Sequence, residues 1–175
     1  MTRSSLLHDQ LLEQADHLAT RERRRPRQAS LRRAVSSAYY SLFHFLIHCS
    51  TSALAGASSG KSGLRSVLAR AYMHGVMLKA ARCFGSGSLP PSLSAHLGSS
   101  GPSRELRHIA ESFAALQEQR HRADYDLAAS SRRQDVVALV RRAELAMSSW
   151  KMVSGQPAAD LFLVSLLTWD RLRKR

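Results

Sequence analysis

Apolar residues recur along the chain with the spacing of amphipathic helices. From Ser5 to Ala19, leucines and alanines fall on one stripe. The same i, i+3, i+4 spacing predicts a second helix from Gln28 to Ser50 and a third from Leu64 to Phe84. No segment alternates between apolar and polar residues as a half-buried strand does. The pattern therefore predicts an all-α fold.

Start and stop signals place three more helices in the second half of the chain. Ser103 can cap a fourth helix, and Ser131 opens a Ser-Arg-Arg-Gln capping box for a fifth. A last helix is expected from Pro157. Gly85 is placed to end the third helix, and Gly85–Ser103, rich in Gly, Ser and Pro, is expected to be a flexible surface loop.

These elements predict an antiparallel up-and-down helical bundle of five to six helices. Residues 1–155 are expected to form the bundle. Residues 156–175 are expected to form an additional C-terminal helix that packs on the bundle or mediates assembly.

The charge of the chain is strongly positive. There are 26 Lys and Arg against 13 Asp and Glu, a net charge of +13, and most of the excess is arginine. Because the guanidinium pairs in bidentate fashion with phosphate or carboxylate, this composition is compatible with RNA, DNA or an acidic protein. A GC-rich genome would raise arginine content as well, so the charge alone does not decide the function.

Nothing in the chain points to a metal, a cofactor or a membrane. Cys49 and Cys83 lack the spacing of a zinc site or a disulfide framework. The apolar run Leu161–Leu167 is too short to span a bilayer, and Met1–Ala19 has no signal-peptide core. We therefore expect a cytoplasmic protein with no membrane association, no cofactor and no metal.

Two further patterns look like ligand sites but lack required parts. Gly56–Ser62 resembles a phosphate-binding loop, yet three residues rather than four separate its glycines, and it follows a predicted helix instead of a strand. His44 and His48 share a helix face, but no third ligand is near in sequence. A helix connection and packing or surface histidines are the simpler interpretations.

The segment from Arg120 to Asp126 carries the most informative chemistry. Ile109, Phe113, Leu116 and Arg120 recur at helical spacing, so Arg120 lies on the apolar stripe of its helix. An arginine there needs an anion, because an unpaired buried charge is costly. One interpretation is an internal pair with Asp124, four residues on. The other makes Arg120 a phosphate ligand in a groove.

Two segments of the chain resemble signatures of the HEPN family of small helical domains. The first is Arg32–His44, Arg-Arg-Ala-Val-Ser-Ser-Ala-Tyr-Tyr-Ser-Leu-Phe-His, on the predicted second helix. The second is Arg120–Tyr125, Arg-x-x-Ala-Asp-Tyr. Two predicted helices and a loop separate them, and with the helix count the resemblance covers roughly Ser5 to Trp150.

The resemblance implies a compact bundle that forms a homodimer and brings two Arg motifs to a shared cleft. Many HEPN proteins are metal-independent RNases whose motif is Arg, four to six residues, then His. Several are toxins paired with a small nucleotidyltransferase as antitoxin. In some of these pairs the partner adenylylates a tyrosine at the end of the toxin's motif.

This chain departs from the RNase pattern, because Tyr125 stands where the motif places histidine. A phenol, with an ordinary pKa near ~10, is poorly suited to act as a base at neutral pH. His121 is close in sequence and is the available substitute. A tyrosine at position 125 instead fits the adenylylated-toxin pattern, which makes Tyr125 the expected modification target.

Two hypotheses follow. The first is a toxin-type protein that binds RNA and cleaves it without metal, with a catalytic set of Arg120, His121, Asp124 and Tyr125. Phosphate contacts are then expected from the basic segment Arg21–Arg27 and from arginines of the helices that follow. The residues singled out are Arg24, Arg25, Arg27, Arg32, Arg33 and Arg122. The alternative is a non-catalytic dimerisation or interaction module, which the missing motif histidine favours; an adaptor role in host defence is a variant of it.

Overall fold

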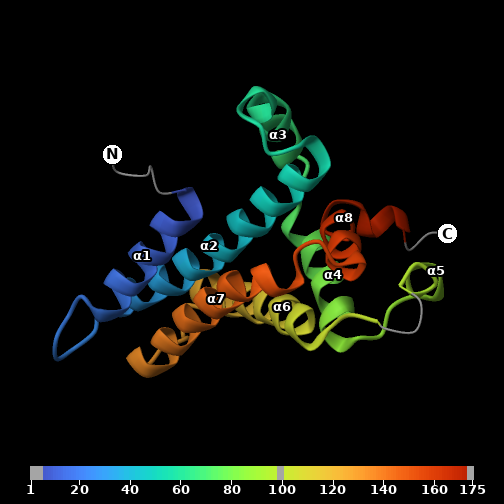
Figure 1. Cartoon of the computed structure of the whole chain (residues 1–175). Helices are drawn as coiled ribbons and strands as arrows, with labels where there is room; N and C mark the ends of the chain where they lie inside the picture. The colour runs from blue at the N-terminus through green and yellow to red at the C-terminus, as the bar shows by residue number, and fades with distance from the viewer. Residues whose placement is uncertain (1–5, 98–100, 173–175) are drawn as a thin grey trace. The chain divides into compact units, whose positions relative to one another are not determined.

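The computed structural model describes residues 6–97 and 101–172, and within these ranges every regular element is a helix. Eight α-helices and one short 3₁₀ helix follow one another in the described residues, with no strand (Figure 1). The predicted all-α fold is confirmed. The number of helices is higher than the predicted five to six, because one expected helix is split and one expected loop contains a short helix.

The chain divides into two compact units, each built from two separate stretches of sequence. Unit 1 comprises Met1–Phe45 and Ala115–Ser148, and unit 2 comprises Leu46–Ala114 and Ser149–Arg175. The expected boundary between residues 155 and 156 falls inside unit 2. Three long helices therefore contribute residues to both units, which a division by sequence position does not anticipate.

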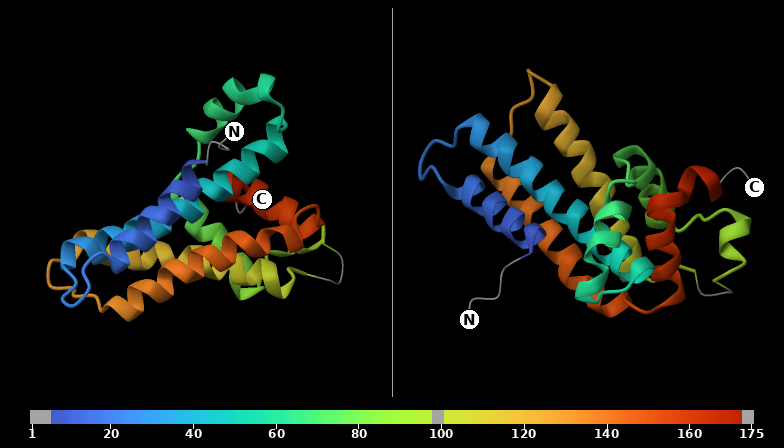
Figure 2. Two further views of the ribbon diagram at one scale, coloured as in Figure 1. Left: turned by 60° about the vertical axis from the view of Figure 1, so that its left-hand side comes forward. Right: turned by 90° about the horizontal axis from the view of Figure 1, so that it is seen from above.

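Unit 1 is a bundle in which four helical segments lie side by side in both views of Figure 2. They are α1 (Leu7–Thr20) and the parts of α2 (Gln28–Ala55), α6 (Arg104–Tyr125) and α7 (Arg133–Val153) that belong to this unit.

Side-chain hydrogen bonds define the direction of neighbouring helices in unit 1. Ser41 Oγ donates to the His8 carbonyl at 2.8 Å and Ser37 Oγ to Gln14 Oε1 at 3.1 Å, so α1 and α2 are antiparallel. Pairing of Arg32 with Ala123 and of Tyr39 with Gln117 likewise makes α2 and α6 antiparallel. The up-and-down arrangement predicted from the sequence is confirmed for this unit.

The core of unit 1 uses the apolar stripe predicted for the second helix. Leu31, Ala34, Ala38 and Leu42 are completely buried, and Leu116 of α6 is buried as well. Burying a leucine side chain contributes about 1.5–3 kcal/mol, so this stripe stabilises the packing of α2 against its neighbours.

Unit 2 has an apolar core built from the end of α2, the residues that follow it up to Ala114, and the last part of the chain from Ser149 on. Its own elements are η1 (Ser59–Lys61), α3 (Ser62–Ala69), α4 (His74–Ser86), α5 (Pro91–Ser94) and α8 (Pro157–Leu172). The C-terminal helix α8 packs on α4. Their contact includes Phe84 and Phe162, whose ring centroids are 5.1 Å apart.

The single helix predicted from Leu64 to Phe84 is wrong, because the chain breaks between α3 and α4. Tyr72 lies in the break, is 7% exposed, and shares a hydrogen bond with Ser50 of α2. Met73 is extended, with φ −113° and ψ 129°. A contact with a residue far back in the sequence turns Tyr72 inward, and the local apolar periodicity carries no trace of it.

The predicted end of that helix at Gly85 is also wrong. The helix continues to Ser86, and Gly87 adopts the left-handed conformation, φ 72°, that ends it. Gly85 is buried instead, where a Cβ atom would approach the Glu111 side chain to 2.9 Å. The expected loop Gly85–Ser103 contains α5; its residues 98–100 lie outside the described residues.

The two predicted helix caps have different outcomes. Ser103 Oγ accepts the Leu106 N–H at 3.3 Å, which confirms the expected cap of α6. The Ser131 capping box is wrong, since α7 begins at Arg133. The Ser131 N–H donates to Gln28 Oε1 at 2.8 Å rather than to Gln134, so a tertiary contact replaces the local one.

Candidate functional site

A cluster of polar and aromatic side chains lies between α2 and α6 in unit 1. It consists of Arg120, Asp124 and Tyr125 of α6 with Ser36, Tyr39 and Tyr40 of α2, and we call it the Arg120 cluster. Residues 36, 39 and 40 follow helical spacing on α2, and residues 120 and 124 do so on α6. Two antiparallel helices therefore bring together signatures that are about eighty residues apart.

The Arg120 guanidinium is held by side chains on several sides. Its Nε lies 2.7 Å from Asp124 Oδ2, an ion pair in which the N–H does not point at the oxygen. Its Nη2 donates to the Tyr40 hydroxyl at 3.0 Å. The rings of Tyr40, Tyr125 and Tyr39 lie 5.5, 5.7 and 6.0 Å from the guanidinium carbon, within the range of cation–π attraction.

Asp124 is positioned by both helices. Its Oδ1 accepts a hydrogen bond from Ser36 Oγ at 2.7 Å, while its other oxygen faces Arg120. The Arg120 and Asp124 side chains are 19% and 26% exposed. Solvent therefore reaches the pair, and the ion pair predicted four residues apart on one helix is confirmed.

Ionisation in the cluster follows from burial and neighbouring charges. Burial disfavours the charged guanidinium of Arg120, but attraction to Tyr40, Asp124 and Tyr125 outweighs it, so its pKa lies above the ordinary value. Burial raises the pKa of Tyr39 well above the usual range for a phenol. The cluster thus holds a permanent cation beside a neutral, buried ring.

One end of the Arg120 side chain has capacity for a ligand. Among the described residues, Nη2 and Nε have the partners given above and Nη1 has none. An unpaired guanidinium N–H next to a constrained one is suited to an anionic oxygen, because charge-assisted hydrogen bonds are the stronger kind. The site can therefore take a phosphate or carboxylate oxygen without breaking the pair with Asp124.

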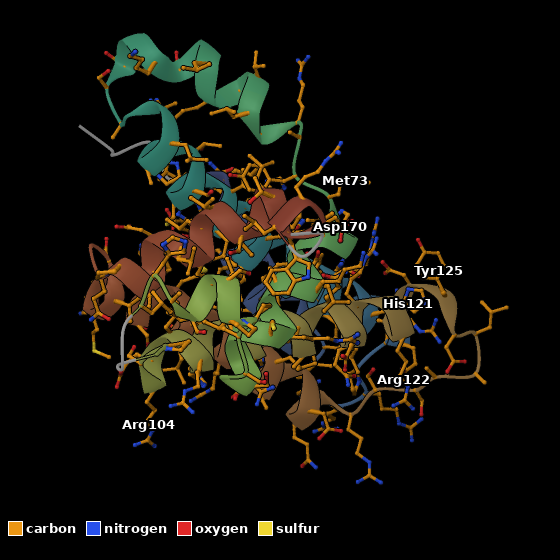
Figure 3. The ribbon with its side chains drawn as sticks, turned by 90° about the vertical axis from the view of Figure 1, so that its right-hand side faces the viewer. Met73, Arg104, His121, Arg122, Tyr125 and Asp170 are labelled. Carbon is orange, nitrogen blue, oxygen red and sulfur yellow. The ribbon has the colours of Figure 1, made fainter. Side chains whose placement is uncertain are left out.

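His121 and Tyr125 form the outer edge of the cluster. The Tyr125 residue is 64% exposed, and its ring centroid is 4.9 Å from that of His121. Figure 3 shows both side chains close together near the C-terminal end of α6. His121 is exposed and adjoins the cluster through its contact with Tyr125. Among the described residues, no direct contact joins His121 to Arg120.

Arg122 lies on another face of α6. At 100° per residue it is rotated far from Arg120, and it lines a small cavity of about 90 Å³ together with Arg32. Figure 3 places its side chain on the opposite side of the ribbon from Tyr125. The structure does not bring Arg122 into the Arg120 cluster.

Arg32 is occupied by backbone acceptors. Its Nη1 donates to the Ala123 carbonyl at 3.2 Å, and its Nη2 lies 2.5–3.2 Å from the carbonyls of Asp126, Leu127 and Ala129. We call this set the Arg32 cap. These are carbonyls at and after the end of α6, which otherwise lack helical partners. Arg32 therefore stabilises a helix end.

The other predicted phosphate contacts divide into two groups. Arg24 and Arg25 are exposed in the turn between α1 and α2. Arg27 and Arg33 line a groove that also contains Tyr40 of the Arg120 cluster. Arg21, which belongs to the predicted basic segment, lines the same groove, and so does Ser36, which was not singled out as a site residue from the sequence. Ser36 stands four residues before Tyr40, on the same face of α2, and this spacing is the sequence signal that would have identified it.

The described residues contain no group of three or more His, Cys, Asp or Glu side chains that could hold a metal ion. Burial raises the pKa of the Cys49 thiol to about 12, which leaves it protonated at neutral pH. Burial also lowers the pKa of His44. Among the described residues, no helix is both long and apolar enough to cross a membrane.

Comparison with protein-family models, curated proteins and solved structures finds no match to this chain.

Proposed function

We propose that this chain is a HEPN-like protein that binds RNA, with Arg120 as the ligand of a backbone phosphate. The observation that carries the proposal is the state of the Arg120 guanidinium. It is partly buried, oriented by Asp124 and Tyr40, and has one terminal nitrogen without a partner among the described residues. A cation held in this way binds an anion with little loss of side-chain entropy.

The proposal extends to metal-independent cleavage. The 2′-hydroxyl gives its proton to a base and attacks the adjacent phosphorus, the bond to the 5′-oxygen breaks, and an acid protonates that oxygen. Arg120 stabilises the extra negative charge on the phosphate oxygens. His121 and Asp124 are the acid–base candidates because they lie one and four residues after Arg120 on α6. Tyr125 shapes the site with its ring over the guanidinium.

Regulation belongs to the same proposal. Tyr125 is 64% exposed, so a partner enzyme can reach its hydroxyl. Adenylylation by a nucleotidyltransferase antitoxin would place a bulky phosphodiester next to Arg120. A homodimer would bring two such sites together, as the family resemblance implies.

The test is incubation of the purified protein with labelled tRNA and mRNA in EDTA. We expect metal-independent cleavage that is lost in Arg120→Ala and retained in Arg141→Ala, an exposed arginine of α7 in the same unit. Tyr125→Phe keeps the ring and should still bind RNA, whereas His121→Ala should lose cleavage and keep binding. Binding assays on the same RNAs separate the two steps.

A second candidate function is a non-catalytic interaction module. It is favoured by the tyrosine at position 125 and by the exposed position of His121 outside direct contact with Arg120. Absence of both cleavage and salt-dependent RNA binding in the wild-type protein would overturn the RNA proposal and leave this candidate. RNA binding without cleavage would overturn only the catalytic part.

A further inference from the structure

A groove runs along α2 in unit 1 and ends at the Arg120 cluster. Its volume is about 570 Å³, and its walls come from α1, the turn after it, and the first turns of α2. From Ala29 to Tyr40, both lining residues, the helix advances by about 16 Å at ~1.5 Å per residue. The groove is therefore longer than a single phosphate contact requires.

Positive charge dominates the groove. Arg21, Arg27 and Arg33 line it, and all three are exposed. Glu22 is the one carboxylate among its lining residues. The chain carries no Asp or Glu at all from Arg23 to Arg104, so α2 contributes only cations and neutral groups to this wall.

The groove and the Arg120 cluster share two residues. Ser36 and Tyr40 line the groove and also hold the cluster, Ser36 by donating to Asp124 and Tyr40 by accepting from Arg120. A chain of phosphates lying on Arg27 and Arg33 would consequently be led towards Arg120. The basic turn and the cluster, which are far apart in the sequence, belong to one continuous surface.

The shape and the apolar wall of the groove favour a single strand. The groove lies between α1 and α2, and the axes of packed helices are only about 8–10 Å apart, too narrow for a duplex. Proteins recognise duplex RNA across a wide, shallow groove, whereas unpaired bases can be splayed onto protein side chains. Leu11 and Leu18 of α1 are half-buried here and offer an apolar surface to a base.

Glu22 opposes an anionic ligand in this groove. One of its carboxylate oxygens accepts a hydrogen bond from Ser30 Oγ at 2.8 Å, beside the beginning of α2. The hydrogen bond from Ser30 lowers the pKa of Glu22 below its ordinary value, which keeps the carboxylate ionised at neutral pH. It places a negative charge among the three arginines.

We propose that the groove binds single-stranded RNA, with Arg21, Arg27 and Arg33 on its phosphates, and that Glu22 limits the affinity. This inference rests on the proposed RNA-binding function and assigns the path by which the strand reaches Arg120.

The experiment is fluorescence anisotropy with a labelled single-stranded RNA and with the same strand annealed to its complement. The triple variant Arg21→Ala, Arg27→Ala, Arg33→Ala should bind the single strand at least tenfold more weakly. Its slope of log affinity against log salt should fall by about 2, since each phosphate contact on a single strand contributes ~0.7. Glu22→Gln should bind several-fold more tightly, because it removes the opposing charge and can still accept from Ser30.

The matched control is the triple variant Arg132→Ala, Arg141→Ala, Arg142→Ala, which removes the same charge from exposed positions before and on α7 in unit 1. It should keep most of the wild-type affinity, and thermal melts should show that both triple variants are folded. Equal losses in the two triple variants, or equal affinity for duplex and single strand, would refute the groove assignment.

The groove inference and the proposed function fail in different ways. If Arg120→Ala weakens RNA binding and the groove triple variant does not, the groove assignment is wrong and the proposed function stands. If the wild-type protein binds neither RNA, both are wrong. An unchanged RNA affinity in Glu22→Gln would refute the proposed role of Glu22. The path of the strand along the groove would then be tested by the triple variant alone.

Discussion

The Arg32 cap and the Arg120 cluster lie between the same two helices, yet their arginines have opposite environments. Both terminal nitrogens of Arg32 donate to main-chain carbonyls at the end of α6. The described partners of Arg120 are side chains: Asp124 in an ion pair, Tyr40 in a hydrogen bond, and the nearby tyrosine rings. Its Nη1 is unpaired among the described residues. A guanidinium saturated by backbone holds the fold, whereas one oriented by side chains and left partly unpaired can bind a ligand.

The largest expected effect on stability is at Arg32. Arg32→Met should lower the free energy of unfolding by about 2–4 kcal/mol, because several hydrogen bonds from a charged group are lost together and the end of α6 loses its partners. Urea denaturation measures this. The neighbouring Arg33→Met is the control, since Arg33 is exposed and should change stability by less than ~0.5 kcal/mol. Equal effects at the two positions would break the comparison.

Arg120→Met should have the reverse profile. We expect a stability loss of about 1 kcal/mol, because Asp124 keeps its bond from Ser36 and stays partly hydrated. RNA affinity should fall at least tenfold under the proposed function. Arg32→Met should leave the affinity of the folded protein nearly unchanged. Parallel anisotropy and denaturation on both variants would show whether the two arginines separate in this way.

Ser36→Ala should produce a smaller, mixed effect. It removes the hydrogen bond that fixes Asp124 Oδ1 and should cost about 1 kcal/mol or less. Because Asp124 then has more freedom beside Arg120, RNA affinity should drop a few-fold without being lost. Ser148→Ala is the matched control and should keep RNA affinity, because Ser148 is an exposed serine of α7 in the same unit whose hydroxyl donates to the Leu145 carbonyl. An affinity loss as large as that of Arg120→Met would make Ser36 part of the ligand contact itself.

The smallest expected effect is the loss of thermal stability at acidic pH. His44 stacks on Tyr40, a member of the Arg120 cluster, and burial lowers its pKa below the ordinary 6.5. Because the pKa of His44 is lower in the folded than in the unfolded protein, its contribution to stability is fully present above the unfolded-state pKa. This contribution is lost as the pH falls through the folded-state pKa. The melting temperature should therefore decline below pH ~6.5, and His44→Gln should flatten that decline. Glu22, whose pKa is also lowered, titrates at more acidic pH and should leave this window unchanged.

Much of the fold could be predicted because its signals are local. The apolar stripe of the second helix, from Leu31 to Leu42, reappears as the core of unit 1, and Ser103 caps α6 as its position indicated. The errors lie where distant residues intervene. Tyr72 breaks a periodic helix by turning towards Ser50, and Gln28 takes the Ser131 N–H that Gln134 was expected to bind.

The sequence by itself determined that the chain is helical, that α2 presents an apolar stripe, and that Arg120 would need an anion, for which Asp124 was one of two candidates. These follow from helical geometry and the cost of an unpaired buried charge, which act within one segment. Only the tertiary structure decided which arginines are available. Arg32 and Arg33 are adjacent in sequence, yet one points to the carbonyls at the end of α6 and the other to the groove. Successive helical residues face directions about 100° apart, and the neighbouring helix decides what each of them meets.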